Sequence, residues 1–443
     1  METFRGVELI FKCVRCGEAF SDIKMVTCPL CNGLLSPDID LEFRINEKER
    51  GIWRFSGVLP KFTFKITMGE GNTPLLESTR LFKGLNIYFK DEGRNPTGSF
   101  RDRIAPLLVS DALERGVRRL ILASDGNMGV SISAYAARSG LRVTVYSPSW
   151  IEEEKALLMK AFGASLVLSD QSIDSLLDLV SRKSGKANIY DASTIHNPLS
   201  IEGLKTIAYE IFMEYKNPPD YVFLPLGSGV TFLGLYRGFE ELVKLGLISR
   251  IPRLIGVEHC ANPKYFQLFK PVEKCRETLL TGLGYNQPYI MPAVREIIEK
   301  YGDVVVINTK EAIRAAKLLS KREGLFVEPS SAVSLAGFLK YGIRENSIIL
   351  LTGHGLKAPV LYARPVRKRF STPFPGITKK MILEVISRKP GVTGYEVWKQ
   401  LGMNITPQAV YQHLSHLVRM GYLDVKFEGG VKKYFPKSIE SFT

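Results

Sequence analysis

The chain has 443 residues, 45% of them hydrophobic, and a formal net charge of +15. A chain of this length and composition is typical of about three globular domains with large buried cores. No apolar run approaches the ~18 residues of a transmembrane helix, and the first residues open onto mixed polar sequence without the apolar region of a signal peptide. We therefore expect a soluble, cytoplasmic protein and exclude one that spans a membrane.

The first predicted element is a cysteine-rich segment over residues 1–40. It holds two CxxC pairs separated by eleven residues, a spacing typical of a zinc ribbon in which four thiolates hold one tetrahedral ion. The four candidate ligands are Cys13, Cys16, Cys28 and Cys31. A ribbon without metal and a redox pair remain as alternatives. Cys260 and Cys275 stand far apart in the sequence, and we expect both to be buried as small apolar residues.

From residue 41 to residue 362 the sequence alternates between apolar strands and amphipathic helices. Near-continuous apolar strands that are separated by helices indicate parallel sheets covered on both faces, and thus an α/β fold. The predicted strands are residues 120–123, 142–147, 165–168, 221–225, 254–258, 304–307 and 347–351.

Glycine-rich turns follow three of these strands, at residues 123–129, 226–234 and 351–355. In parallel sheets ligands bind at the carboxyl ends of the strands, and a turn that leads into a helix can hold a phosphate with its backbone amides. A single turn of this kind is an ordinary loop about half the time, so each one alone is a weak indicator.

The segment NPTGSFRDR, residues 95–103, precedes another predicted helix. Asn95 to Gly98 are predicted to form a turn, because proline presets φ and glycine tolerates a positive φ. Ser99 is the predicted cap of the helix that follows. A backbone of this shape presents amides to an anion.

Together these motifs resemble those of the threonine synthases, which belong to the fold-type II pyridoxal phosphate (PLP) enzymes. The resemblance covers about residues 1–360 and extends to the N-terminal ribbon of the archaeal type. Its motifs are GIWRFSGVLP, GEGNTPLL, KDEGRNPTGSFRDR, the DGN turn, IEGLKT, GSGVTFLG, EGLFVEPSSA and LTGHG. The resemblance implies a two-lobed core over residues 41–362, similar to the β subunit of tryptophan synthase, with parallel sheets.

The resemblance also implies which residues would bind PLP. Asn127 would face the phenolic oxygen of the cofactor, and Thr352 would hydrogen-bond its pyridine nitrogen. The phosphate would be held by Gly227, Ser228, Gly229, Val230 and Thr231.

Arg101 stands where the family carries its Schiff-base lysine. A lysine there must lose a proton to become a nucleophile, and it later moves protons at the substrate carbons. A guanidinium stays protonated to about pH 12 and beyond, so it forms no stable imine. We expect PLP, if bound, to be held without a covalent bond. Lys205 and Lys90 lie in motifs near the site, but imine formation needs near-attack geometry, so we expect neither to substitute.

Asp125 is a second departure from the family pattern, which usually has Ser or Thr in this loop. The loop receives the carboxylate of the substrate, and an anion at this position would repel an amino acid. Val230 also thickens the phosphate loop slightly. The positive charge of Arg101 could pair with an anion, so the expected ligand is small, anionic and amino-acid-like.

The last 80 residues, 364–443, contain fourteen Lys and Arg against five Asp and Glu, which places +9 of the net charge there. A proline-rich, charged linker over residues 363–375 separates this tail from the core. Helical spacing predicts helices at residues 377–389, 394–401 and 408–420, and alternation around a Gly-Gly turn predicts a β-hairpin at 422–435. This order of elements is typical of a winged helix-turn-helix over residues 376–443.

The tail resembles winged-helix DNA-binding domains of prokaryotic regulators. The third helix would face the bases and the wing would lie at the phosphates. The expected DNA-contacting residues are Gln408, Ala409, Gln412, His413, Lys426, Lys432 and Lys433. The basic run of residues 367–369 could add phosphate contacts. The alternative is a domain for dimerisation or docking, because the third helix lacks an arginine for guanine readout.

Two functions follow from this sequence. In the first, the chain is a pseudoenzyme of amino-acid metabolism, a homologue of threonine synthase that senses a ligand and binds double-stranded DNA. In the second, it is a working threonine synthase, a carbon-oxygen lyase that acts on a phosphate ester and converts O-phosphohomoserine and water to threonine and phosphate. Arg101 would then be an engineered change or would be bypassed. A native Arg101 favours the first function, and in both cases we expect a homodimer.

Overall fold

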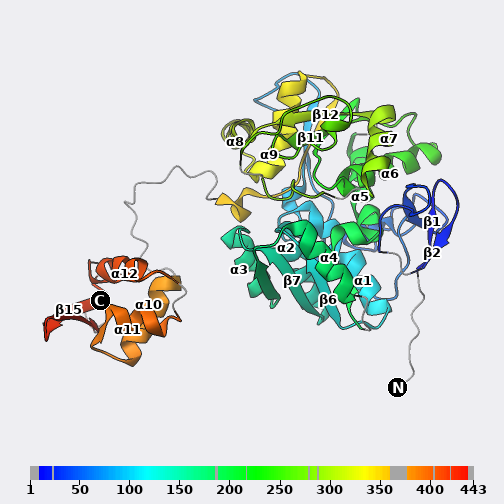
Figure 1. Ribbon diagram of the computed structural model, residues 1–443. Helices are drawn as coiled ribbons and strands as arrows, with labels where there is room; N and C mark the ends of the chain where they lie inside the picture. The colour runs from blue at the N-terminus through cyan, green and yellow to red at the C-terminus, as the bar shows by residue number, and fades with distance from the viewer. Residues whose placement is uncertain are drawn as a thin grey trace. The chain divides into compact units, whose positions relative to one another are not determined.

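The computed structural model describes residues 9–21, 24–184, 188–215, 217–277, 280–286, 289–359, 377–402, 405–419 and 421–437. The chain divides into two compact units, Met1–Ala363 and Arg364–Thr443 (Figure 1). The predicted linker over residues 363–375 lies outside the described residues. Within the described part of the chain, no helix is long and apolar enough to cross a membrane.

The first unit begins with a small antiparallel sheet in the order β2-β1-β3. Its strands are β1 (Phe11–Cys13), β2 (Ala19–Phe20) and β3 (Leu35–Pro37). Phe11 and Leu35 are buried in the same hydrophobic core as the domain that follows. The small sheet is therefore packed against the core of the first unit.

Two larger sheets form the rest of the first unit. The four-stranded sheet, in the order β8-β7-β6-β9, is entirely parallel. The six-stranded sheet, in the order β12-β11-β10-β13-β5-β4, is parallel except for the edge strand β4. The strands are β4 (Leu75–Glu77), β5 (Ile87–Asp91), β6 (Arg119–Ala123), β7 (Arg142–Pro148), β8 (Ser165–Ser169), β9 (Tyr190–Asp191), β10 (Tyr221–Pro225), β11 (Arg253–His259), β12 (Gly302–Ile307) and β13 (Ser347–Leu351). All seven strands that the apolar runs predicted are confirmed.

Helices cover these sheets, as the burial of the inner strands requires, whereas the edge strand β8 is largely exposed. They are α1 (Ala105–Glu114), α2 (Asn127–Ser139), α3 (Glu153–Ala161), α4 (Ile173–Ser184), α5 (Leu199–Tyr215), α6 (Val230–Lys244), α7 (Met291–Tyr301), α8 (Thr309–Leu318) and α9 (Pro329–Tyr341). Short helical turns are η1 (Gly51–Phe55), η2 (Glu92–Arg94), η3 (Phe100–Arg103), η4 (Thr194–His196), η5 (Phe266–Leu268), η6 (Leu319–Glu323) and η7 (Gly355–Lys357).

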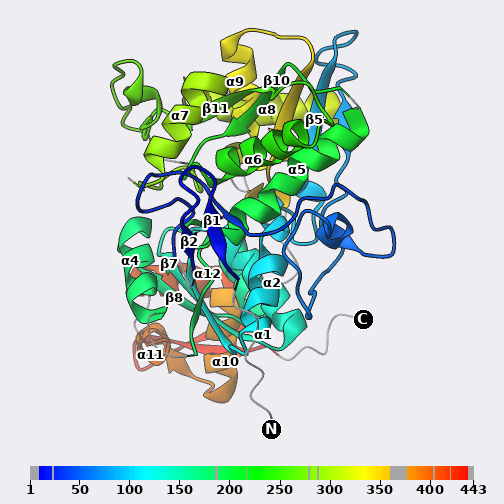
Figure 2. The ribbon, with the colours of Figure 1, turned by 90° about the vertical axis from the view of Figure 1, so that its right-hand side faces the viewer.

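Helices α5 and α6 lie side by side (Figure 2). Two glycines of α6 allow this close approach, because a Cβ at Gly234 would lie 2.5 Å from Cβ of Leu204, and one at Gly238 would lie 2.5 Å from the carbonyl oxygen of Lys205. The packing holds α6 rigidly, and the N-terminus of this helix forms part of the candidate site.

The described residues of the second unit form three helices and a three-stranded antiparallel sheet in the order β14-β16-β15. Its elements are α10 (Ile377–Arg388), β14 (Val392–Thr393), α11 (Gly394–Gln400), α12 (Pro407–Arg419), β15 (Leu423–Glu428) and β16 (Val431–Pro436). The predicted helices and hairpin are present, whereas the sequence did not predict β14. Gly429 and Gly430 both have positive φ, at 59° and 77°, as a tight hairpin turn requires. Ile382, Val410 and Leu414 belong to a hydrophobic core that this unit forms by itself.

Candidate functional site

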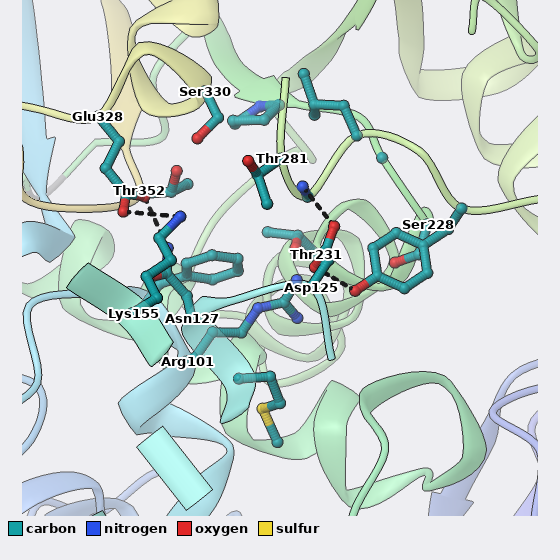
Figure 3. Close-up of a pocket in the computed structure, with 17 residues that line it drawn as sticks. Arg101, Asp125, Asn127, Lys155, Ser228, Thr231, Thr281, Glu328, Ser330 and Thr352 are labelled. Carbon is teal, nitrogen blue, oxygen red and sulfur yellow. Dashed lines mark hydrogen bonds and ion pairs between the residues drawn. The ribbon is translucent and has the colours of Figure 1, made fainter. Parts of the chain in front are cut away.

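The three predicted glycine-rich turns meet at one pocket of the first unit, at the carboxyl ends of β6, β10 and β13 (Figure 3). Six of the predicted site residues line this pocket. They are Arg101, Asn127, Gly227, Ser228, Thr231 and Thr352. Gly229 and Val230 belong to the same turn but do not line the pocket, and the side chain of Val230 is fully buried.

The turn before α6 is shaped for an anion. A Cβ at Gly227 would overlap the carbonyl oxygen of Gly282, so only glycine fits there. Gly229 has a left-handed φ of +95°, and a Cβ at this position would lie 2.6 Å from the hydroxyl of Tyr265. The first backbone N–H groups of a helix have no partner within the helix, and they carry partial positive charge. The turn and the hydroxyls of Ser228 and Thr231 therefore form a cradle suited to a phosphate.

The opposite end of the pocket is lined by further polar side chains. Thr352 follows β13 and is almost fully buried. Asn127 begins α2, and its Nδ2 donates a hydrogen bond of 2.7 Å to Oε2 of Glu328. Oδ1 of Asn127 is buried and has no hydrogen-bond partner among the described residues. Because buried polar atoms are nearly always satisfied, this oxygen is an acceptor suited to a donor group in the pocket.

Arg101 lies in η3 and extends toward Asp125 across the pocket (Figure 3). Its guanidinium lies over the ring of Phe100, 4.5 Å from the centroid, and Nη1 donates a hydrogen bond of 3.3 Å to the hydroxyl of Thr194. Burial lowers the pKa of the Arg101 guanidinium, while Tyr285 and Asp125 oppose this shift. The side chain stays positively charged, because the ordinary pKa of arginine lies far above neutral pH.

Asp125 binds the segment 280–286 to the pocket. Its Oδ2 accepts a hydrogen bond of 2.7 Å from the backbone N–H of Gly282, and its Oδ1 accepts one of 2.7 Å from the hydroxyl of Tyr285. Burial and the neighbouring carboxylate raise the pKa of Tyr285, so the phenol keeps its proton and acts as a donor. The sequence predicted the charge at Asp125 but did not predict these partners.

Lys155 is a pocket residue that the sequence analysis missed. Its side chain is 2% exposed. Its Nζ lies 3.2 Å from Oε1 of Glu328 and 3.4 Å from Oε2 of Glu152. Burial lowers the pKa of Lys155, but the two carboxylates outweigh burial and the pKa is raised overall. The only signal in the sequence was a lysine in the first turn of a predicted helix, which does not indicate a pocket.

Lys205 and Lys90, in contrast, do not line the pocket. Nζ of Lys205 lies 2.5 Å from a carboxylate oxygen of Glu202 and 3.1 Å from one of Glu241. Lys90 is equally buried, and its Nζ lies within 3.0 Å of Glu210. Both amines are held in buried ion pairs and do not face the pocket.

Lys357 is a second buried cation that the sequence did not indicate. It does not line the pocket, but it interacts electrostatically with Glu328 and Arg101, which do. It is 4% exposed, and its Nζ has no hydrogen-bond partner among the described residues. Burial lowers the pKa of Lys357 to about 8, although the carboxylates of Glu328 and Asp102 act in the opposite direction. Its side chain lies beside Gly98, in the same turn that leads to Arg101.

The predicted helix cap at Ser99 is wrong. The hydroxyl of Ser99 is buried without a partner among the described residues, and it makes no capping hydrogen bond. Asp102 orders this turn instead, since its carboxylate accepts hydrogen bonds of 2.6 Å from the backbone N–H and the hydroxyl of Thr97. Burial raises the pKa of Asp102 to about 6. A carboxylate accepts two donors at once, which a serine hydroxyl with one oxygen does less well.

The four N-terminal cysteines lie together. Sγ of Cys13 lies 3.3 Å from Sγ of Cys31, and Sγ of Cys16 lies 3.8 Å from Sγ of Cys28. All four sulfur atoms lie within 4.8 Å of one another, a grouping that could hold a tetrahedral metal ion.

Cys260 and Cys275 form a disulfide, so the prediction of two separate apolar cysteines is wrong. Cys260 directly follows β11, and the backbone N–H of Cys275 donates a hydrogen bond of 3.1 Å to its carbonyl oxygen. The two cysteines are 15 positions apart, and no motif in the 14 residues between them indicated the pairing.

The predicted DNA-contacting residues lie on two elements of the second unit. Gln408 and Gln412 are exposed on α12, one turn apart, while Ala409 and His413 are half-buried. On the hairpin, Lys426 and Lys432 are exposed, and Lys433 is half-buried in an ion pair of 3.0 Å with Glu428. The basic run of residues 367–369 lies outside the described residues.

Comparison with known proteins bears directly on this site. The family model described as pyridoxal-phosphate dependent enzyme matches residues 66–353, more than half of the chain. The chain belongs to this family. It is 34% identical over 383 residues to the threonine synthase of Methanocaldococcus jannaschii, which covers 79% of this chain and 93% of that protein. It is 35% identical over 304 residues to the threonine synthase of Mycobacterium tuberculosis, with 66% of this chain and 84% of that protein covered.

Solved structures show the fold of the PLP family in this chain. A hydrogen sulfide-producing enzyme from Fusobacterium nucleatum matches with a TM-score of 0.55 and 24% identity, over 65% of this chain and 97% of that chain. A cysteine synthase from Entamoeba histolytica matches with a TM-score of 0.54 and 23% identity, over 66% and 88%. The predicted α/β, PLP-type core is therefore confirmed, and its relatives include threonine synthases.

Proposed function

We propose that this chain is a ligand-sensing, DNA-binding regulator built on the core of a PLP-dependent enzyme. The observation that carries the proposal is Arg101, a guanidinium in the pocket at the place where the resemblance puts the Schiff-base lysine. The phosphate cradle beside it is intact. Such a chain is a cytoplasmic pseudoenzyme that keeps a ligand pocket and has lost its nucleophile.

The residues of the pocket fit PLP without a covalent bond. Gly227, Ser228 and Thr231 would hold the phosphate at the N-terminus of α6. Thr352 would hydrogen-bond the pyridine nitrogen, and Asn127, with its unpartnered amide oxygen, would face the phenolic oxygen. PLP, when bound, supplies an electron-withdrawing ring.

The charged side chains of the pocket argue against efficient catalysis. A family enzyme needs an amine that gives up a proton, and Arg101 keeps its charge at neutral pH. Lys155 is the lysine among the pocket-lining residues, and its ion pair with Glu328 raises its pKa. Neither cation can serve as the general base near neutral pH.

The second unit supports the DNA-binding part of the proposal. Gln408 and Gln412 project from α12, the position of a recognition helix in a winged helix-turn-helix, and could reach base edges. Lys426 and Lys432 on the exposed hairpin would contact phosphates. A small anionic, amino-acid-like ligand in the pocket would then bias DNA binding. A homodimer would present two such units to half-sites about one helical turn apart.

The cysteine cluster has a structural role in this proposal. Four thiolates fill all four positions of a tetrahedral zinc ion, which leaves none for a substrate. The ion would hold the small N-terminal sheet on the core.

A mobility-shift assay tests the DNA-binding proposal. We expect the full chain to bind duplex DNA at low salt and a chain truncated after Ala363 not to bind. Affinity should fall steeply with salt, and the slope of log K against log salt should decrease by about 0.9 for each phosphate contact removed. If the full and truncated chains behave alike, the second unit is a docking domain.

A matched pair of triple variants sharpens the test. In the first, the hairpin residues Lys426, Lys432 and Lys433 are changed to Gln, and we expect weaker binding with a smaller salt slope. The control carries the same change of charge on exposed lysines of the first unit, and we expect it to bind as the unmodified chain does. The control lysines are Lys244, Lys300 and Lys340.

The second candidate function is threonine synthase itself, which the identity to enzymes of that name favours. In that case Arg101 is an engineered change or is bypassed. The test is release of phosphate from O-phosphohomoserine by the purified chain with added PLP. Phosphate release that depends on added PLP and that Gly227→Ala, in the phosphate cradle, abolishes would support the enzyme and count against the regulator.

A further inference from the structure

We propose that Asp125 is a specificity-determining residue that excludes carboxylates from the pocket, so that the pocket accepts a phosphorylated vitamin B6 compound alone. This inference rests on the proposed function. It keeps a small anion as the ligand of that function and identifies it as a pyridine that carries a phosphate and no carboxylate, in place of an amino acid.

The first reason is that Asp125 occupies donors which a ligand carboxylate would need. The backbone N–H of Gly282 and the hydroxyl of Tyr285 both line the pocket, and each donates a 2.7 Å hydrogen bond to Asp125. A carboxylate is bound by pairs of donors of this kind. Asp125 therefore already occupies both donors with its own carboxylate. The carboxylate of a ligand would find no free donor there and would be repelled by the negative charge of Asp125.

The second reason is that the segment carrying these donors is fixed on its other sides. Nδ2 of Asn262 donates a hydrogen bond of 3.2 Å to the carbonyl oxygen of Leu283. The ammonium of Lys264 donates to the carbonyl oxygen of Tyr285, and the hydroxyl of Thr281 donates to Glu152. With these contacts in place, Gly282 and Tyr285 cannot turn away from Asp125 to bind a ligand instead.

The third reason is that the carboxylates of the pocket offset the charge of its cations. Arg101 faces Asp125, whose negative charge favours the charged form of the guanidinium (Figure 3). Lys155 is paired with Glu328 and Glu152. Among the described residues that line the pocket, Arg101 is the cation without an ion pair, and the nearby charge of Asp125 offsets its attraction for the carboxylate of an amino acid.

One anion site remains, at the turn before α6. Ser228 and Thr231 line the pocket there, beside the backbone amides of a 15-residue helix. Those groups bind one phosphate. The pocket therefore matches a ligand with a single phosphate.

The test compares two ligands that differ only in a carboxylate. They are N-(5′-phosphopyridoxyl)-L-threonine and the corresponding adduct of 1-amino-2-propanol, both of which lack an aldehyde. Dissociation constants are measured by calorimetry on the full chain. We expect the carboxylate-free compound to bind at least about tenfold more tightly, the size expected of one uncompensated charge repulsion in a partly buried site.

Variants of Asp125 should remove this preference. Asp125→Ser frees both donors, and we expect the threonine adduct to bind as tightly as the carboxylate-free adduct or more tightly. Asp125→Asn keeps an acceptor for Tyr285 but no charge, so it covers the case in which the serine variant fails to fold. The control is Asp178→Asn, on the exposed surface of α4, which should keep the preference unchanged.

Equal or tighter binding of the threonine adduct by the unmodified chain would overturn the inference. Failure of both compounds to bind would overturn it as well, because the pocket would then not be a site for vitamin B6 phosphates. The DNA-binding part of the proposed function is measured separately by mobility shift, so its failure is recognised independently of these constants.

Discussion

At the scale of single residues, the pocket is governed by which charges have partners. Arg101 faces Asp125, and Lys155 is held by two carboxylates. Lys357, almost fully buried, has no hydrogen-bond partner among the described residues. Each of these environments sets whether a side chain can exchange a proton at neutral pH.

The missing amine at residue 101 gives the first prediction. Arg101→Lys should form a covalent bond with added PLP, because the cradle before α6 and Thr352 are still present to orient the cofactor. Borohydride reduction and peptide mass mapping should find a pyridoxyl group on residue 101 of the variant and none in the unmodified chain. Turnover should stay poor while Asp125 remains in place.

Arg94→Lys is the control for this experiment, because Arg94 is exposed and does not line the pocket. It should gain no pyridoxyl group. A pyridoxyl group on Lys155 or Lys205 of the unmodified chain would show that another amine has taken over, and the pseudoenzyme proposal would then fail.

The buried ammonium of Lys357 gives a second prediction. Burial lowers its folded-state pKa from 10.5 to about 8. Below pH 8 both states carry the charge, and the folded state bears the cost of burying it. Lys357→Met should therefore raise the free energy of unfolding at pH 7 by up to about 3 kcal/mol.

The pH dependence has a definite sign. Between pH 8 and pH 10.5 the folded state has lost the proton and the unfolded state still binds it, so the unmodified chain gains stability as the pH rises. The advantage of Lys357→Met should shrink toward pH 10 in urea titrations. Lys340→Met, at an exposed position, should change stability by less than about 0.5 kcal/mol at either pH. A pH-independent gain from Lys357→Met would contradict this account.

At the scale of elements, the glycine signal placed the turn before α6 correctly, and the zinc ribbon predicted over residues 1–40 stays a prediction. The sheet of β1, β2 and β3 buries few side chains, since strands of two or three residues supply little apolar area. A small element of this kind usually needs a metal or a disulfide to be stable. The four clustered thiols are suited to that role.

The cysteine cluster gives a third prediction. Freshly reduced protein should contain one zinc ion per chain, and Cys31→Ser should lose it, because three thiolates hold the ion much more weakly than four. Metal analysis by mass spectrometry provides the measurement. As a control, Cys275→Ser removes the disulfide between Cys260 and Cys275, and this variant should keep the zinc. A metal-free native protein would favour the alternative of a ribbon without metal.

At the scale of the whole molecule, the chain consists of two units, Met1–Ala363 and Arg364–Thr443, each with its own hydrophobic core. A separate core allows each unit to unfold by itself. The division also separates the match to the PLP family, which ends at residue 353, from the basic second unit.

The two-unit organisation gives a fourth prediction. Calorimetry of the full chain should show two transitions, and the fragment of residues 1–363 should keep the first one unchanged. Leu414→Ala, in the core of the second unit, should lower only the second transition, since truncating a buried leucine costs about 2–5 kcal/mol. Leu233→Ala in α6 is the converse control and should lower only the first. A single transition that moves with both substitutions would contradict independent units.

The sequence by itself determined the elements and most of the pocket. Apolar runs in the sequence predict the strands β6, β7 and β10. Glycines predict the turns, because a left-handed or crowded backbone requires glycine. The alternation of apolar runs and amphipathic segments predicts the order of the elements. These signals are local: periodicity and turn chemistry depend on residues that are neighbours in the chain. The resemblance to the family likewise places Arg101 at its lysine position from the amino-acid sequence alone, which is the basis of the proposed function.

Only the tertiary structure decided which charged side chains form ion pairs or hydrogen bonds and which do not. Asp125 and Tyr285 are 160 residues apart, Lys155 meets Glu328 from another strand-helix unit, and Lys357 lies beside the turn of Gly98. Hydrogen bonds and ion pairs act over a few ångströms, so their partners depend on which segments the fold brings together and on how completely water is excluded. Sequence spacing carries neither quantity. For this reason the sequence did not predict that Asp125 accepts hydrogen bonds from Gly282 and Tyr285, which line the pocket. It also did not predict that Lys155 lines the pocket.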